Sequence, residues 1–146
     1  MSDPRTPETV DADIVKALIE VRGRAYVPYS SHPVGALLIS DSGTRYVGAN
    51  VEVAHYKGLC AEASAIAAMV TSGETRLKEV YVIGPGEHLC TPCGDCRQRL
   101  REFSSPDTLI RVVDADGQLL KRYTMDELLP DSFGPENLGK DSAFVS

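Results

Sequence analysis

The chain has 146 residues, a net charge of −6 and 42% hydrophobic residues, which suits one soluble domain with its own hydrophobic core. Its longest apolar run, residues 65–70, is far short of the roughly 20 residues of a membrane span, and its acidic charge argues against a polynucleotide partner. An apolar signal segment is absent from its N-terminus, so we expect the cytoplasm, where cysteines more often bind metals or catalyse reactions than form cross-links.

The first half of the chain predicts a helix, a hairpin and a second helix. Residues 1–10 look like a loose tail, and apolar residues then recur with helical spacing over residues 11–25. Two strands, over residues 34–40 and 44–52, form the hairpin. The segment 60–71 is rich in alanine and apolar on all sides, which predicts a buried helix.

The second half predicts a strand, a helix and then two strands, over residues 80–84, 93–103, 109–113 and 118–123. Thr124 and Glu127 form a capping box that opens a short helix, which Pro130 ends. This order predicts a single α/β domain over residues 1–146, with a mixed five-stranded sheet in a three-layer α/β/α arrangement.

Three of the four cysteines fall at predicted helix starts. Cys60 opens one helix, while Cys93 and Cys96 share one face of the first turn of the next. Helix N-termini stabilise thiolates, and three thiolates on Zn²⁺ leave a fourth position open for water, as in catalytic zinc sites. Glu62 can take a proton from that water and return it to a substrate.

Other interpretations of the cysteines remain. Cys90, Cys93 and Cys96 have the spacing of a ferredoxin-type cluster motif, but Leu100 stands where that motif requires a fourth cysteine. We interpret Cys90 as a small buried residue at the end of a strand. If Cys90 instead supplied a fourth zinc ligand, the chain would be a structural zinc-binding interaction module, which is the non-enzymatic alternative.

The motifs as a set resemble one known family. They are N-x-E (50–52), C-A-E (60–62), P-C-x-x-C (92–96) and ELLPDSFG (127–134). In this order they resemble the short, homotetrameric cytidine deaminases of the cytidine and deoxycytidylate deaminase superfamily. The resemblance implies one zinc ion per subunit and hydrolysis of cytidine and deoxycytidine to uridine and deoxyuridine in pyrimidine salvage. Water activated by the zinc attacks C4 of the base, and Glu62 carries the protons.

The resemblance also implies how a pyrimidine nucleoside is held. Asn50 and Glu52 would bind the ribose hydroxyls, and their alternation along a strand places both side chains on one face. The backbone of Ala61 would contact the base. Tyr56 and Phe133 would complete the pocket of a neighbouring subunit in the homotetramer.

The sequence departs from the family pattern in ways that bear on substrate range. His32 replaces a phenylalanine that stacks on the base, Val53 replaces an asparagine, and the loop 54–59 is about one residue shorter than usual. Ala63 replaces an arginine that offsets the charge of the thiolates, which leaves Arg97 and the helix N-termini for that role. A deaminase of a modified cytosine nucleoside or of blasticidin S is therefore the alternative enzyme.

Overall fold

The computed structural model describes residues 8–144. Its sheet consists of β1 (Gly35–Ser40), β2 (Arg45–Ala49), β3 (Leu77–Ile83), β4 (Leu109–Val113) and β5 (Leu119–Thr124). The strands lie in the order β2-β1-β3-β4-β5. The β3–β4 pair is parallel and the other neighbouring pairs are antiparallel, so the sheet is mixed and five-stranded as predicted.

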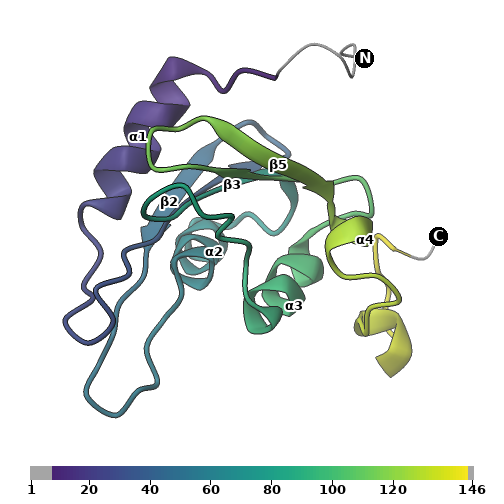
Figure 1. Cartoon of the computed structure of the whole chain (residues 1–146). Helices are drawn as coiled ribbons and strands as arrows, with labels where there is room; N and C mark the ends of the chain where they lie inside the picture. Colours follow the sequence, from purple (N-terminus) through teal and green to yellow (C-terminus); the bar gives the residue numbers. More distant parts are fainter. Residues whose placement is uncertain (1–7, 145–146) are drawn as a thin grey trace.

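Helices cover both faces of this sheet (Figure 1). α1 (Ala12–Arg22) lies on one face, and α2 (Ala61–Thr71) and α3 (Gly94–Phe103) lie on the other. The predicted three-layer α/β/α fold is confirmed. The short α4 (Met125–Leu128) and a 3₁₀ helix, η1 (Pro135–Leu138), follow β5. Within residues 8–144, every helix is too short to span a membrane.

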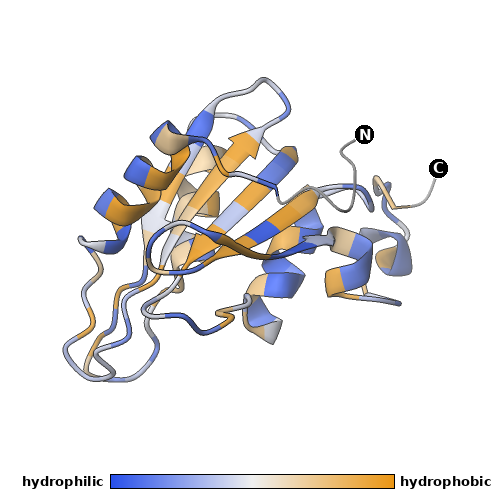
Figure 2. Ribbon diagram, turned by 45° about the horizontal axis from the view of Figure 1, so that its top comes forward, coloured by the Kyte–Doolittle hydropathy of each residue, from blue (hydrophilic) through white to orange (hydrophobic). Residues whose placement is uncertain are grey.

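The sheet separates two hydrophobic clusters. Along β1, Leu37 packs with Leu18 of α1, whereas Leu38 packs with Met69 of α2, because successive side chains of a strand point to opposite faces. The central strands β1, β3 and β4 are mostly buried, and the edge strands β2 and β5 are largely exposed. Figure 2 shows the same contrast as a mainly hydrophobic centre of the sheet.

A close approach between α2 and β2 sets the position of α2. Gly48 of β2 lies under the first turns of the helix, where a Cβ atom would come within 2.4 Å of the Ala65 amide nitrogen and 2.6 Å of the Ala61 carbonyl oxygen. Both neighbours are backbone atoms that cannot rotate away. Glycine in β2 and alanine in α2 therefore allow the helix to sit directly on the strand.

Several predicted boundaries differ from the structure. Residues 1–7 of the expected tail lie outside the described residues, but residues 8–10 belong to the fold, because Val10 is buried against α1 and Glu8 forms an ion pair with Arg111. β2 ends at Ala49 rather than at residue 52. β3 begins at Leu77, three residues earlier than predicted. The prediction missed these residues because Lys78 and Glu79 are polar.

The expected burial of α2 on all sides is correct for only part of its surface. Ala61, Ala65 and Met69 are buried, but Ala67 and Val70 are exposed, Val70 by 41%. An apolar side of this helix is thus left open to solvent in the single chain.

We expect Gly48→Ala to lower the free energy of unfolding by about 1–3 kcal/mol, the usual cost of overpacking. Gly94→Ala is the matched control, because a Cβ there meets no atom within 4 Å and alanine favours the helix. Urea unfolding of both variants tests this. Equal stability of the two variants would contradict the close packing of α2 on β2.

Candidate active site

Cys60, Cys93 and Cys96 converge from the starts of two helices. Cys60 is the N-cap of α2 and Cys93 is the N-cap of α3, and neither thiol caps its own helix by a hydrogen bond. Cys96 lies in the first turn of α3 and is fully buried. The Sγ atoms of all three lie within 4.8 Å of one another. The C-x-x-C spacing therefore places an N-cap thiol and a first-turn thiol on the same side of one helix end.

The geometry of this group fits a tetrahedral zinc ion. Zn–S bonds of about 2.3 Å at tetrahedral angles place two sulfur ligands about 3.8 Å apart, and the Sγ atoms of Cys60 and Cys93 are 3.9 Å apart. Because Cys60 and Cys93 are the N-caps of α2 and α3, their thiols lie at the positive ends of the helix dipoles, which favour the charged form of a thiol. Burial raises the pKa of the Cys60 and Cys96 thiols, so a metal ion must displace their protons when it binds.

Glu62 lies beside this group in the first turn of α2. Its side chain is 4% exposed, and burial raises the pKa of its carboxyl group. A carboxyl group with a raised pKa exchanges protons closer to neutral pH. The position at the wall of a cavity, next to the thiols, is where a proton carrier for a hydrolytic reaction is needed.

The three cysteines and Glu62 line a cavity of about 220 Å³ at the C-terminal end of β3. Its wall also contains Ala61 at the start of α2, His32 from the loop before β1, and Asn50, which directly follows β2. The structure thus brings together most of the site residues that the sequence predicts.

Asn50 and Glu52 both face the loop of residues 29–34, although they lie beyond the end of β2. The Asn50 side chain donates to the His32 carbonyl oxygen (3.0 Å) and accepts from the Val34 amide (2.9 Å). Glu52 accepts from the Tyr29 and Ser30 amides. The hydrogen bond from the Ser30 hydroxyl is the main cause that lowers the pKa of Glu52. These two side chains therefore shape the loop that carries His32.

Glu52 lines a second cavity, of about 280 Å³, rather than the cavity of the cysteines. Tyr56 lies in the wall of this second cavity, is 84% exposed and meets the Tyr29 ring edge-on, with the ring centroids 6.0 Å apart. Phe133 is 57% exposed and belongs to neither cavity wall. Glu52, Tyr56 and Phe133 are thus the predicted substrate-binding residues that the single chain does not bring into the cysteine cavity.

Arg97 binds backbone and hydroxyl oxygens rather than the thiols. Its guanidinium donates to the carbonyl oxygens of Pro92 (2.7 Å) and Leu128 (2.9 Å) and to the Thr91 hydroxyl (3.2 Å). The arginine thus fixes the loop that leads into Cys93. The role of Arg97 as a charge partner of the thiolates stays a prediction.

Cys90 and Thr91 line the cysteine cavity, and the sequence did not assign them to it. Cys90 is only half-buried, lies outside the group of three thiols, and places its Sγ 3.7 Å from Nε2 of His32. Its interpretation as a fully buried packing residue is therefore incomplete. Its position two residues before Pro92-Cys93 was the one signal for a place in the wall.

Comparisons with known proteins agree with this geometry. Residues 8–112 match the family model described as the cytidine and deoxycytidylate deaminase zinc-binding region. The cytidine deaminase of Sporosarcina psychrophila is 36% identical over 130 residues, which are 86% of this chain and 95% of that protein. That of Mycoplasma genitalium is 39% identical over 122 residues, which are 82% of this chain and 92% of that protein.

Solved structures show the same relationship. The cytidine deaminase of Burkholderia pseudomallei is 30% identical, with a TM-score of 0.78 over 86% of this chain and all of that chain. The cytidine deaminase of Mycobacterium tuberculosis is 34% identical, with a TM-score of 0.73 over 86% of this chain and 98% of that chain. The chain belongs to the cytidine and deoxycytidylate deaminase family, and its three clustered cysteines are placed to bind the zinc ion of that family.

We expect Cys96→Ser to lose most of its bound zinc, because a hydroxyl is a much weaker ligand than a thiolate. Cys90→Ser is the matched control and should retain about one zinc ion per chain. Metal analysis of the purified, folded variants measures this ratio. Loss of zinc in Cys90→Ser would instead support a closed four-cysteine site and a structural module.

Proposed function

We propose that the chain is a zinc-dependent hydrolase that deaminates cytidine and deoxycytidine to uridine and deoxyuridine. The observation that carries the proposal is the convergence of three thiols and the buried Glu62 in one cavity that Asn50 also lines. The family membership and the relatives named cytidine deaminase support the choice of substrate. The enzyme would act in the cytoplasm, in pyrimidine salvage.

Glu62 would carry the protons of the reaction. When bound, the zinc ion supplies Lewis-acid activation of a water molecule. Glu62 would accept one proton of that water as its oxygen bonds to C4, and deliver this proton to N3 of the pyrimidine ring. It would then take the second proton from the new hydroxyl at C4 and pass it to the amine, which leaves as ammonia when the C4–N bond breaks. Its burial keeps bulk water away from the carboxyl group and holds it at one wall of the cavity.

Asn50 and Glu52 would bind the ribose while they hold the loop of residues 29–34. The Asn50 oxygen has a second lone pair beyond its bond to Val34, and the Glu52 carboxylate has acceptor sites beyond its bonds to Tyr29 and Ser30. Ribose hydroxyls can donate to these sites. The two cavities would then hold different parts of one nucleoside.

His32 supports a second candidate substrate class, a cytosine nucleoside with a modified ring or the antibiotic blasticidin S. The imidazole presents nitrogen atoms to the cavity beside Cys90, where a phenylalanine would present only carbon. A polar wall can donate to or accept from a ring substituent. Turnover of cytidine, deoxycytidine, cytosine and blasticidin S under identical conditions distinguishes these substrates.

We also propose that four copies assemble and share their active sites. The open side of α2 and the exposed side of α3 border a groove of about 680 Å³. Ala67 and Val70 give the groove apolar contacts, and Asp95, Arg99 and Glu102 give it both signs of charge. A surface with both signs of charge can pair with a second copy of itself. Assembly would also give Tyr56 and Phe133 a neighbouring pocket to complete.

We expect Glu62→Gln to lower kcat by about 10²- to 10⁴-fold, the usual contribution of general acid–base catalysis, while zinc content and thermal stability are kept. Glu20→Gln, on the exposed side of α1, is the matched control. The loss of the cytidine absorbance measures the rate. An unchanged rate in Glu62→Gln would rule out this mechanism.

We expect Val70→Glu to weaken the assembly, because a carboxylate would be buried against apolar surface. Val47→Glu is the control, since Val47 is similarly exposed, at 45% against 41%, but lies outside the groove. Light scattering during size-exclusion chromatography gives the mass of each variant. A tetramer of normal stability in Val70→Glu would exclude the groove as an interface.

A further inference from the structure

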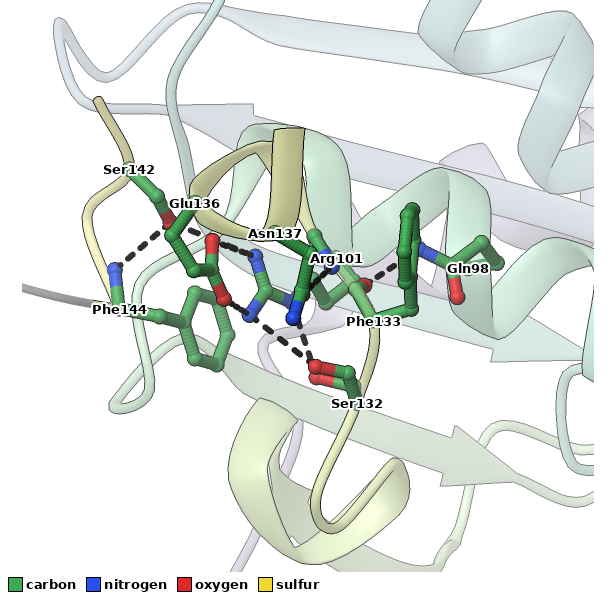
Figure 3. A network of polar contacts seen from close by, with 9 residues as sticks. Gln98, Arg101, Ser132, Phe133, Glu136, Asn137, Ser142 and Phe144 are labelled. Atoms are coloured by element: carbon green, nitrogen blue, oxygen red, sulfur yellow. Dashed lines mark hydrogen bonds and ion pairs between the residues drawn. The ribbon is translucent and has the colours of Figure 1, made fainter. Parts of the chain in front are cut away.

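Arg101 is a buried arginine that the reaction itself does not use. It lies near the end of α3, its side chain is 3% exposed, and its guanidinium faces the C-terminal segment of residues 131–144 (Figure 3). A buried charge is costly unless it is paired. The groups that contact the Arg101 guanidinium therefore show which segment the buried charge holds in place.

The guanidinium is paired on every side by the C-terminal segment. Its two terminal nitrogens donate to the two carboxylate oxygens of Glu136, one at 3.1 Å. Nε donates to the Ser132 hydroxyl at 2.9 Å, and Nη1 also donates to the Ser142 hydroxyl at 3.3 Å. The Phe144 ring covers the face of the guanidinium, with Cζ 3.9 Å from the ring centroid. The hydrogen bonds from Arg101 lower the pKa of Glu136 to about 2.

Gly134 shows how closely the segment approaches the arginine. A Cβ at this position would lie 1.8 Å from Nη1 of Arg101, although the backbone of Gly134 is extended and open to any residue. The glycine is thus required by the guanidinium and not by its own conformation. Arg101, Gly134 and Glu136 form one unit, which we call the arginine clamp.

Phe133 lies between the residues that the clamp holds. Ser132 before it and Gly134 after it both touch the guanidinium, and the Phe133 carbonyl oxygen accepts a hydrogen bond from Gln98 of α3 at 2.8 Å. The backbone of Phe133 is fixed on both sides, yet its ring remains 57% exposed. An ordered backbone that presents an exposed aromatic ring is a typical contact feature.

We propose that Arg101 is a positioning residue for the nucleoside pocket of the neighbouring subunit. The arginine clamp fixes the backbone around Phe133, so that the ring enters the partner pocket already ordered and little conformational entropy is lost there. This inference rests on the proposed deaminase function and on the shared active site. It adds that the ion pair between the buried Arg101 of α3 and Glu136 of η1 keeps Phe133 rigid.

We expect Arg101→Met to raise KM for cytidine by about tenfold with kcat changed less than about twofold, since the clamp affects binding and not proton transfer. Arg101→Lys keeps the positive charge but not the planar guanidinium with its paired donors, so its KM should lie between those of the wild type and Arg101→Met. Arg45→Met is the control: it also removes one positive charge and an ion pair, with Asp13, at an exposed site. If Arg101→Met unfolds, Glu136→Gln gives the same test with a milder change.

Two readouts separate positioning from a general loss of stability. Phe133→Ala should raise KM as well, and adding Arg101→Met to it should raise KM little further, because both act through one ring. In mixed tetramers, Glu62→Gln subunits supply an intact clamp and an intact Phe133 to neighbouring Arg101→Met subunits. Active sites of the Arg101→Met subunits should then regain the wild-type KM.

Each result decides the proposal. A wild-type KM in Arg101→Met or Glu136→Gln, additive effects with Phe133→Ala, or no recovery of KM in mixed tetramers would overturn it. Failure of the deaminase function itself looks different, because the wild-type enzyme would then not release ammonia from any substrate of the nucleoside panel. A wild-type enzyme that turns over cytidine while Arg101→Met keeps its KM refutes the clamp alone.

Discussion

The meeting of two uncapped helix N-termini is the constraint on which the rest of the site depends. Cys60 and Cys93 occupy N-cap positions that a serine or aspartate would usually fill with a hydrogen bond to the first turn. A thiol is a poor cap, so both helix ends keep free N–H groups beside the thiols. A metal ion held by these thiols links the two ends. The sheet must therefore hold α2 and α3 at a fixed separation, and the contact of Gly48 with α2 is part of how it does so.

The same helix start places Glu62 beside the three thiols but outside their group. The residue lies two positions after Cys60, so its side chain leaves the helix in a different direction from the thiol. Burial in the first turn of α2 holds the carboxyl group at the cavity wall and raises its pKa. One short helix end thus places Cys60, Ala61 and the proposed proton carrier Glu62 in the wall of the same cavity.

The sequence predicts what local patterns determine and misses what distant contacts determine. The cysteines at helix starts, the capping box of Thr124 and Glu127, and the mixed sheet follow from spacing and periodicity, and the structure confirms them. The start of β3 was missed because Glu79 is polar. Its pairing with Ile39 of β1 and its ion pair with Arg111 of β4 place it in the strand. The contact of Arg97 with the Leu128 carbonyl oxygen was also missed, because Leu128 lies 31 positions away in the sequence and local patterns do not reveal such a contact.

Three residues of α3 make three different kinds of contact. Cys96 at its start faces the zinc site, Arg101 near its end holds the C-terminal segment, and Gln98 between them binds the Phe133 backbone. Cys96 and Arg101 are both buried, so neither end of the helix can shift without breaking a contact of the other. The position of Phe133 is thereby tied to the position of the metal ligands in its own chain. In an assembly with shared pockets, one helix would relate the zinc site of one subunit to the nucleoside pocket of the next.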